Sequence, residues 1–189
     1  MFPDLVVDPV IVRTCQAAAA IVFGAAAVSK LMAVRRFAGA LDAYALLPPV
    51  LVTPVAWALA LAELAVALLL PLDATRTAAA LGGLVLLAVF FSAIGINLWR
   101  GNRDIDCGCQ AFARRDAGKR VSGALSGWHL ARVALLAALL APVLSEPAAR
   151  EVLWVDYLTV LGGLACASGL FFVIDALLAN RAAAQALEF

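Results

Sequence analysis

The sequence predicts an all-α protein, a polytopic transmembrane bundle with four to five spanning helices. Hydrophobic residues make up 65% of its 189 residues and the mean hydropathy is +1.00, whereas soluble domains are usually about 45–50% apolar. Several apolar stretches also approach the roughly 20 residues that a helix needs to cross a bilayer. Strands with an open edge could not satisfy their backbone in lipid. We therefore expect one integral membrane domain over residues 1–189.

Five apolar stretches are predicted to be helical: residues 10–34, 50–70, 77–99, 128–144 and 152–178. The fourth is short, so it either tilts or reaches only part of the way across. Residues 35–49 mix charged and apolar side chains and end at Pro48-Pro49, which indicates an amphipathic segment at the membrane interface. The N-terminus lacks the basic region of a cleavable signal peptide, so we expect the first helix to be retained. The longest connection, residues 100–127, is polar and basic.

Charge bears on partners and on orientation. A formal net charge of +1 gives no sign of nucleic-acid binding. With five spans, most Lys and Arg residues near helix ends gather on one side, including those of residues 100–127. The excess of positive charge on cytoplasmic loops then predicts an external N-terminus and a cytoplasmic 100–127 connection. That orientation conflicts with any function in which this connection contacts a partner protein in the periplasm.

The chemistry is concentrated at Cys107-Gly108-Cys109, just after the third helix. Two thiols separated by one glycine can close a very small, strained disulfide ring, which is more oxidising than a structural disulfide. Gly108 tolerates the backbone angles that such a ring requires. Arg100 favours the reactive thiolate and Asp106 opposes it, so no net direction follows. The alternatives are incidental cysteines or half of a zinc site, although His129 is the only histidine and zinc needs about four ligands.

Other residues are candidates for relaying electrons or handling protons. Cys15 and Cys166 lie within apolar helices, where cysteine usually behaves as a small hydrophobe; the alternative is an electron relay. Glu63 lies mid-span and is expected to be protonated, to pair with Lys30 or Arg132, or to take up a proton. Snorkelling is the ordinary explanation for charged residues near helix ends, again including Lys30.

Two polar residues complete the set of candidates. His129 is most simply an interfacial residue, with a redox proton donor as the alternative. Asn97 is a candidate to cap or hydrogen-bond between helices near the cysteines.

Several short motifs are spread along the chain: Ser29-Lys30-Leu31, Tyr44-Ala45-Leu46-Leu47-Pro48, Glu63-Leu64-Ala65, Ile96-Asn97-Leu98, Arg100-Gly101 and Ile105-Asp106-Cys107-Gly108-Cys109. Taken together, they resemble the methylamine-utilisation protein MauE family, a branch of the DoxX-like membrane proteins. The resemblance covers residues 10–178, and the last motif is its most specific part. Residues 114–127 depart from the pattern, because they look longer and more basic than the family leads us to expect.

The resemblance implies a DoxX/MauE-like helical protein of the bacterial inner membrane that is needed to make methylamine dehydrogenase. It implies a role in processing, transport or maturation of that enzyme's disulfide-rich β-subunit, with a thioredoxin-like partner, MauD. Our leading hypothesis is thiol-disulfide exchange through Cys107 and Cys109, as one component of a thiol-disulfide oxidoreductase system. The rivals are a non-catalytic membrane chaperone or export factor, and a quinone-linked thiol oxidase in which Glu63 or His129 handles protons. Membrane lipid is a further expected partner, and quinone is the cofactor that the oxidase alternative would use.

Overall fold

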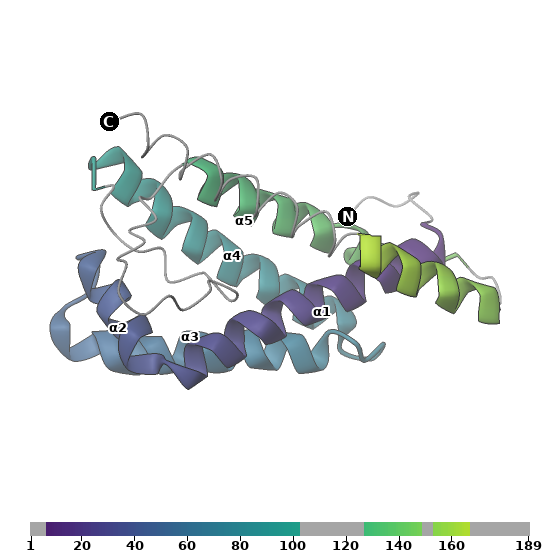
Figure 1. The fold of residues 1–189 in the computed structure, drawn as a ribbon, viewed down its shortest axis with the longest axis horizontal. Coiled ribbons are helices and arrows are strands. Elements are labelled where there is room, and N and C mark those ends of the chain that lie inside the picture. The colour runs from purple at the N-terminus through teal and green to yellow at the C-terminus, as the bar shows by residue number, and fades with distance from the viewer. Residues whose placement is uncertain (1–6, 103–126, 149–152, 167–189) are drawn as a thin grey trace, which may run out of the picture.

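A computed structural model describes residues 7–102, 127–148 and 153–166 of the chain. The described part is a bundle of helices without extended strands (Figure 1), which confirms the predicted all-α fold class. Three of its helices are long and apolar enough to span a membrane: α1 (Pro9–Met32), α3 (Pro49–Leu69) and α4 (Arg76–Trp99). The chain is thus a multi-pass membrane protein.

The first predicted helix corresponds to α1, and a separate short helix follows it. Helix α1 begins at Pro9, with the Asp8 side chain accepting a 2.8 Å hydrogen bond from the Val10 amide, and it ends at Met32. Ala33 leaves the helical conformation (φ −137°, ψ 43°), and α2 (Val34–Ala43) follows. Phe37 is the buried residue of α2, and the arginines beside it are exposed. This short amphipathic helix occupies most of the segment that we expected at the interface.

Helices α3 and α4 form an antiparallel hairpin. Pro49 occupies the first position of α3, where the missing amide hydrogen costs no helical bond. At the other end, the Thr75 hydroxyl donates a 2.7 Å hydrogen bond to the Leu69 carbonyl and so ties the end of α3 to the start of α4. Helix α1 runs antiparallel to α3 as well, because Gly24 lies against Ala67 and Lys30 contacts Glu63.

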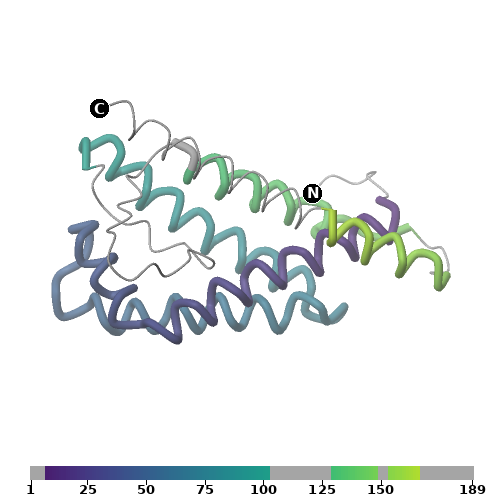
Figure 2. Tube along the Cα trace, viewed as in Figure 1, coloured from purple at the N-terminus to yellow at the C-terminus, as the bar shows by residue number. Residues whose placement is uncertain are grey.

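The fourth apolar stretch forms α5 (Gly127–Leu140) and a short 3-10 helix, η1 (Pro142–Leu144). Helix α5 packs against α4, and η1 contacts both α1 and α4. At 14 residues α5 is short for a span. In the fifth stretch the helix Trp154–Cys166 is described, and its remainder lies outside the described residues. Figure 2 shows this segment in yellow-green beside the start of α1, in agreement with the proximity of Gly163 to Thr14.

The core is built on small residues that let the helices approach closely. Ala27, Ala56, Ala60 and Ala80 are completely buried. At Gly83 of α4 three elements converge: a Cβ there would lie 3.1 Å from Leu140, 3.3 Å from Phe23 and 3.4 Å from Val66. Large apolar side chains such as Val50, Leu68 and Leu135 point outward. In a spanning bundle those side chains face lipid, and close backbone approach supplies the packing between helices.

Candidate functional site

The most unusual feature of the described bundle is a buried ion pair. The Lys30 Nζ donates a hydrogen bond to Glu63 Oε1, and the two side chains are only 5% and 3% exposed. The contact joins the last turn of α1 to the middle of α3. The sequence suggested Lys30 or Arg132 as the partner of Glu63, and in the structure the ion pair is with Lys30. Lys30 therefore does not snorkel to the surface, as its place near a helix end suggested, because a buried carboxylate holds it inward.

Two aromatic rings complete the surroundings of the ammonium group. The Lys30 Nζ lies 5.2 Å from the centre of the Phe37 ring and 4.8 Å from that of Phe90. Both distances are within the range of cation–π attraction. Four helices thus contribute to one centre: α1 and α3 supply the charges, and α2 and α4 supply the rings. Nothing in the sequence singled out these two phenylalanines, because an aromatic residue in an apolar helix is common.

The two oxygens of the Glu63 carboxylate are unequal. Oε1 accepts from Lys30, whereas Oε2 is buried and has no hydrogen-bond partner among the described residues. The centre as a whole is neutral when both groups are charged, which lowers the cost of holding it inside a membrane protein. The remaining oxygen is chemically able to accept a further donor or a proton. A role for Glu63 in proton handling stays a prediction.

A second polar contact fixes the point where the chain leaves α4. The Asn97 side chain is fully buried and donates a 3.1 Å hydrogen bond to the Ala93 carbonyl, while its Oδ1 accepts a 3.3 Å bond from the Asn102 side chain. The backbone amide of Asn102 also donates a 3.0 Å hydrogen bond to the backbone carbonyl of Asn97. Between them Gly101 has φ +78°, a conformation that glycine adopts without strain. These hydrogen bonds fix the chain at Asn102, which is five residues before Cys107 in the sequence.

Four predicted site residues, Cys107, Cys109, Asp106 and Gly108, lie outside the described residues. Arg100 is described as the C-cap of α4, where its backbone amide donates to the Ile96 carbonyl. The structure thus describes the approach to the cysteine motif and gives no geometry for the motif itself.

The other two cysteines are free thiols, Cys15 half-buried in α1 and Cys166 exposed. Cys15 packs beside the apolar core. Cys15 belongs to the second turn of α1, and Cys166 is the last described residue of the helix that lies beside the start of α1 (Figure 2). His129 is half-buried in the first turn of α5 and has an interaction partner. A relay or proton role for these three residues stays a prediction.

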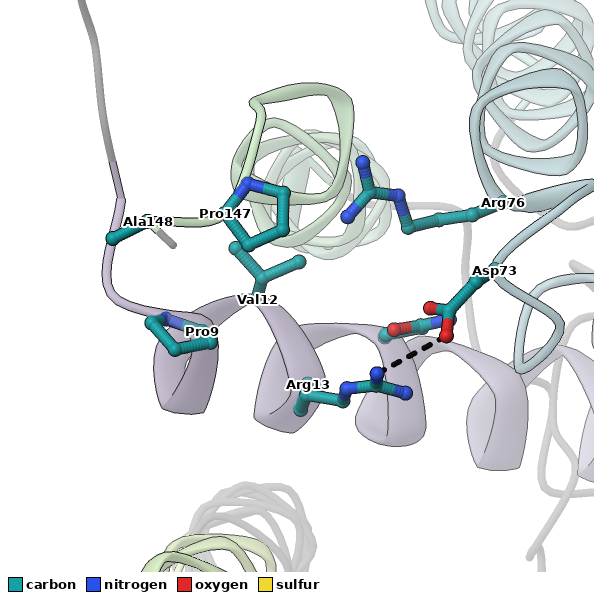
Figure 3. A pocket seen from close by; sticks show the side chains of 8 residues that line it. Pro9, Val12, Arg13, Asp73, Arg76, Pro147 and Ala148 are labelled. Carbon is teal, nitrogen blue, oxygen red and sulfur yellow. Dashed lines mark hydrogen bonds and ion pairs between the residues drawn. The ribbon is translucent and has the colours of Figure 1, made fainter. Parts of the chain in front are cut away.

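A cleft that no sequence motif indicated lies at the end of the bundle remote from Asn102. Figure 3 shows this cleft, about 150 Å³ in volume, between the start of α1, the α3–α4 turn and the segment after η1. Arg13 and Asp73 form a 3.1 Å ion pair at its mouth. Gln16, buried on its wall, donates a hydrogen bond to the Leu70 carbonyl. The available signal was a glutamine inside an apolar helix, one turn from an arginine.

Comparison with known proteins adds a family. Residues 8–146 match the sequence model described as "Methylamine utilisation protein MauE". Proteins of that name from Paracoccus denitrificans and Methylophilus methylotrophus are 37% and 38% identical over 106 residues, which is 56% of this chain. The matched part spans only 57% and 56% of those two relatives. The protein from Paracoccus versutus is 37% identical over 144 residues, 76% of this chain and 74% of the relative. No solved structure matches.

Proposed function

The chain belongs to the methylamine utilisation protein MauE family, and from this membership we propose that it supports maturation of the methylamine dehydrogenase β-subunit by thiol-disulfide exchange. The partner is a thioredoxin-like protein of the MauD type, and the location is the inner membrane of a bacterium. The observation that carries the proposal is the Cys107-Gly108-Cys109 motif placed just after a spanning helix in a chain of this family.

The chemistry needs only the two cysteines and the partner's disulfide. One thiolate of the motif attacks a partner sulfur, which forms a mixed disulfide and releases the other partner sulfur as a thiolate. The second cysteine then attacks the mixed disulfide, which closes the Cys107–Cys109 bond and leaves the partner with two thiols. Two electrons pass from the motif to the partner. The reverse sequence of steps oxidises the partner instead.

The described bundle supports this proposal by fixing the point where the chain leaves α4, ahead of the motif in the sequence. Asn97 is fully buried and hydrogen-bonded to Asn102, so the chain leaves the bundle at a defined point at the end of α4. Only four residues separate Asn102 from Cys107 in the sequence, and sites close to a rigid element are positioned more precisely than sites far along a loop. The end of α4 also places that departure at the membrane surface, where a soluble partner can reach it.

The experiment is to trap the exchange. Cys109→Ser and Cys107→Ser are each introduced into the full chain, and the membranes are quenched with acid and alkylated. Because exchange stops when the resolving thiol is missing, one of the two variants accumulates a mixed disulfide with the thioredoxin-like partner. A Cys15→Ser/Cys166→Ser variant is the matched control, since it removes two thiols and keeps the motif.

The functional readout is the assembly of methylamine dehydrogenase with its β-subunit disulfides formed. The proposal expects assembly to fail in a Cys107→Ser/Cys109→Ser double variant. Normal assembly in that variant would rule out exchange and would leave a non-catalytic membrane chaperone as the explanation.

A further inference from the structure

The cleft at the end of the bundle remote from Asn102 lies where lipid headgroups lie. It is formed by the first turns of α1, the turn between α3 and α4, and residues Pro147 and Ala148 after η1 (Figure 3). Each of α1 and α4 has 24 residues, which is about 36 Å of helix and slightly exceeds the roughly 30 Å of a bilayer's hydrocarbon core. The ends of these spans are therefore at the membrane–water interface.

The cleft is a formed structure with an apolar wall. The Ala148 amide donates a 3.0 Å hydrogen bond to the Val7 carbonyl, which ties the segment after η1 to the chain two residues before α1. Pro9, Val12 and Pro147 line the space beneath this tie. Charges beside such a wall are less screened than charges surrounded by water.

The charge of the lining is positive. Arg13, Arg76 and Asp73 are its ionisable residues, and Asp73 is paired with Arg13. Arg76 is half-buried and has no hydrogen-bond or ion-pair partner among the residues that the structure describes. Figure 3 shows its guanidinium group directed into the cleft toward Pro147, away from the Arg13–Asp73 pair. The lining thus presents one guanidinium group without a counter-ion in the described part of the chain, that of Arg76, to a ligand in the cleft.

The surroundings suit a lipid anion better than a soluble one. A guanidinium group binds phosphate oxygens through two parallel N–H donors. Ile11 and Leu72, next in sequence to residues of the lining, are 51% and 54% exposed. Exposed apolar side chains on the elements that form a basic cleft can contact the acyl chains of a lipid whose phosphate enters it, and basic pockets between spanning helices are known to hold anionic headgroups.

We propose that this cleft binds the headgroup phosphate of an anionic phospholipid, with Arg76 as its principal ligand and Arg13 at its mouth. The site is independent of the thiol chemistry, because it lies at the end of the bundle opposite the departure of the chain toward the cysteines. A bound headgroup would hold the first turns of α1 and α4 and the segment after η1 together at the membrane surface.

The test is lipid binding to the purified full-length protein in detergent, measured by native mass spectrometry. Phosphatidylglycerol and phosphatidylcholine are titrated separately, and inorganic phosphate is titrated as a third ligand. We expect phosphatidylglycerol to bind more tightly than phosphatidylcholine, and Arg76→Gln to weaken its binding about fivefold, the effect of one basic contact at a membrane surface. Arg36→Gln, an exposed arginine of α2 at the far end, is the matched control and should leave the affinity unchanged.

A second variant separates a lost site from a damaged fold. Asp73→Asn removes the lining carboxylate and frees Arg13, so phosphatidylglycerol should bind about fivefold more tightly. A misfolded protein would not gain affinity. The proposal is overturned if Arg76→Gln binds phosphatidylglycerol as the wild type does, or if the two lipids bind equally. Binding of inorganic phosphate as tight as that of phosphatidylglycerol would assign the cleft to a soluble anion and would also overturn it.

Discussion

Replacing Glu63 by glutamine tests the buried ion pair most directly. The Lys30 ammonium group is held by one carboxylate oxygen and two aromatic rings, and its side chain is 5% exposed. Glu63→Gln keeps the size of the side chain and removes its charge, so a buried cation loses its counter-ion. Breaking one partner of a buried pair costs about 3–5 kcal/mol. At about 2–4 °C per kcal/mol for a chain of this size, the melting temperature should fall by roughly 10 °C.

The assay is thermal unfolding of the purified protein in one detergent, with two comparison variants. Arg13→Gln breaks the ion pair with Asp73, whose side chains are 48% and 66% exposed, so it should cost no more than about 1 kcal/mol. Lys30→Met/Glu63→Met removes both buried charges and keeps much of their volume, so it should be far more stable than Glu63→Gln. The reasoning is refuted if Glu63→Gln loses no more stability than Arg13→Gln, or if the double methionine variant is as unstable as the single one.

Three further predictions concern the packing around this centre and the end of α4. Gly83→Ala should lower the free energy of unfolding by about 1–3 kcal/mol, because the new Cβ would lie 3.1 Å from the Leu140 side chain. Gly95→Ala, where a Cβ has nothing within 4 Å, should be neutral or stabilising by up to about 1 kcal/mol. Equal melting temperatures of the two variants would contradict the close approach at Gly83. In a double-mutant cycle, Lys30→Met and Phe90→Leu should be coupled by about 0.5–2 kcal/mol, and strict additivity of their unfolding free energies would exclude a cation–π contact. Asn97→Leu removes the side-chain hydrogen bonds to Ala93 and Asn102. The rate at which the mixed disulfide is trapped should fall, while the free energy of unfolding changes by about 1–2 kcal/mol at most. An unchanged trapping rate would show that the Asn97 hydrogen bonds do not position the motif.

Much of the architecture was predictable from local composition. Long apolar stretches must be helical in lipid, so the spans could be recognised one by one. Glu63 was recognisable for the same reason, because a carboxylate in mid-span is costly and needs an explanation. The motifs around Cys107 and Cys109 indicated the MauE family, to which the chain belongs. Each of these inferences depends on neighbours in sequence, or on the motifs of a family.

What only the tertiary structure decided is which faces of the helices meet. A soluble helix shows its buried side as an apolar stripe, but α1, α3 and α4 are so largely apolar that no such stripe marks which of their residues pack. The antiparallel register of α1 and α3 selects Lys30, 33 residues from Glu63, as its partner. The same packing brings Phe37 and Phe90 to the ammonium group and gathers Arg13, Asp73 and Arg76 around one cleft. Sequence periodicity describes single helices, whereas a site shared by several helices exists only once their ends and registers are set against one another.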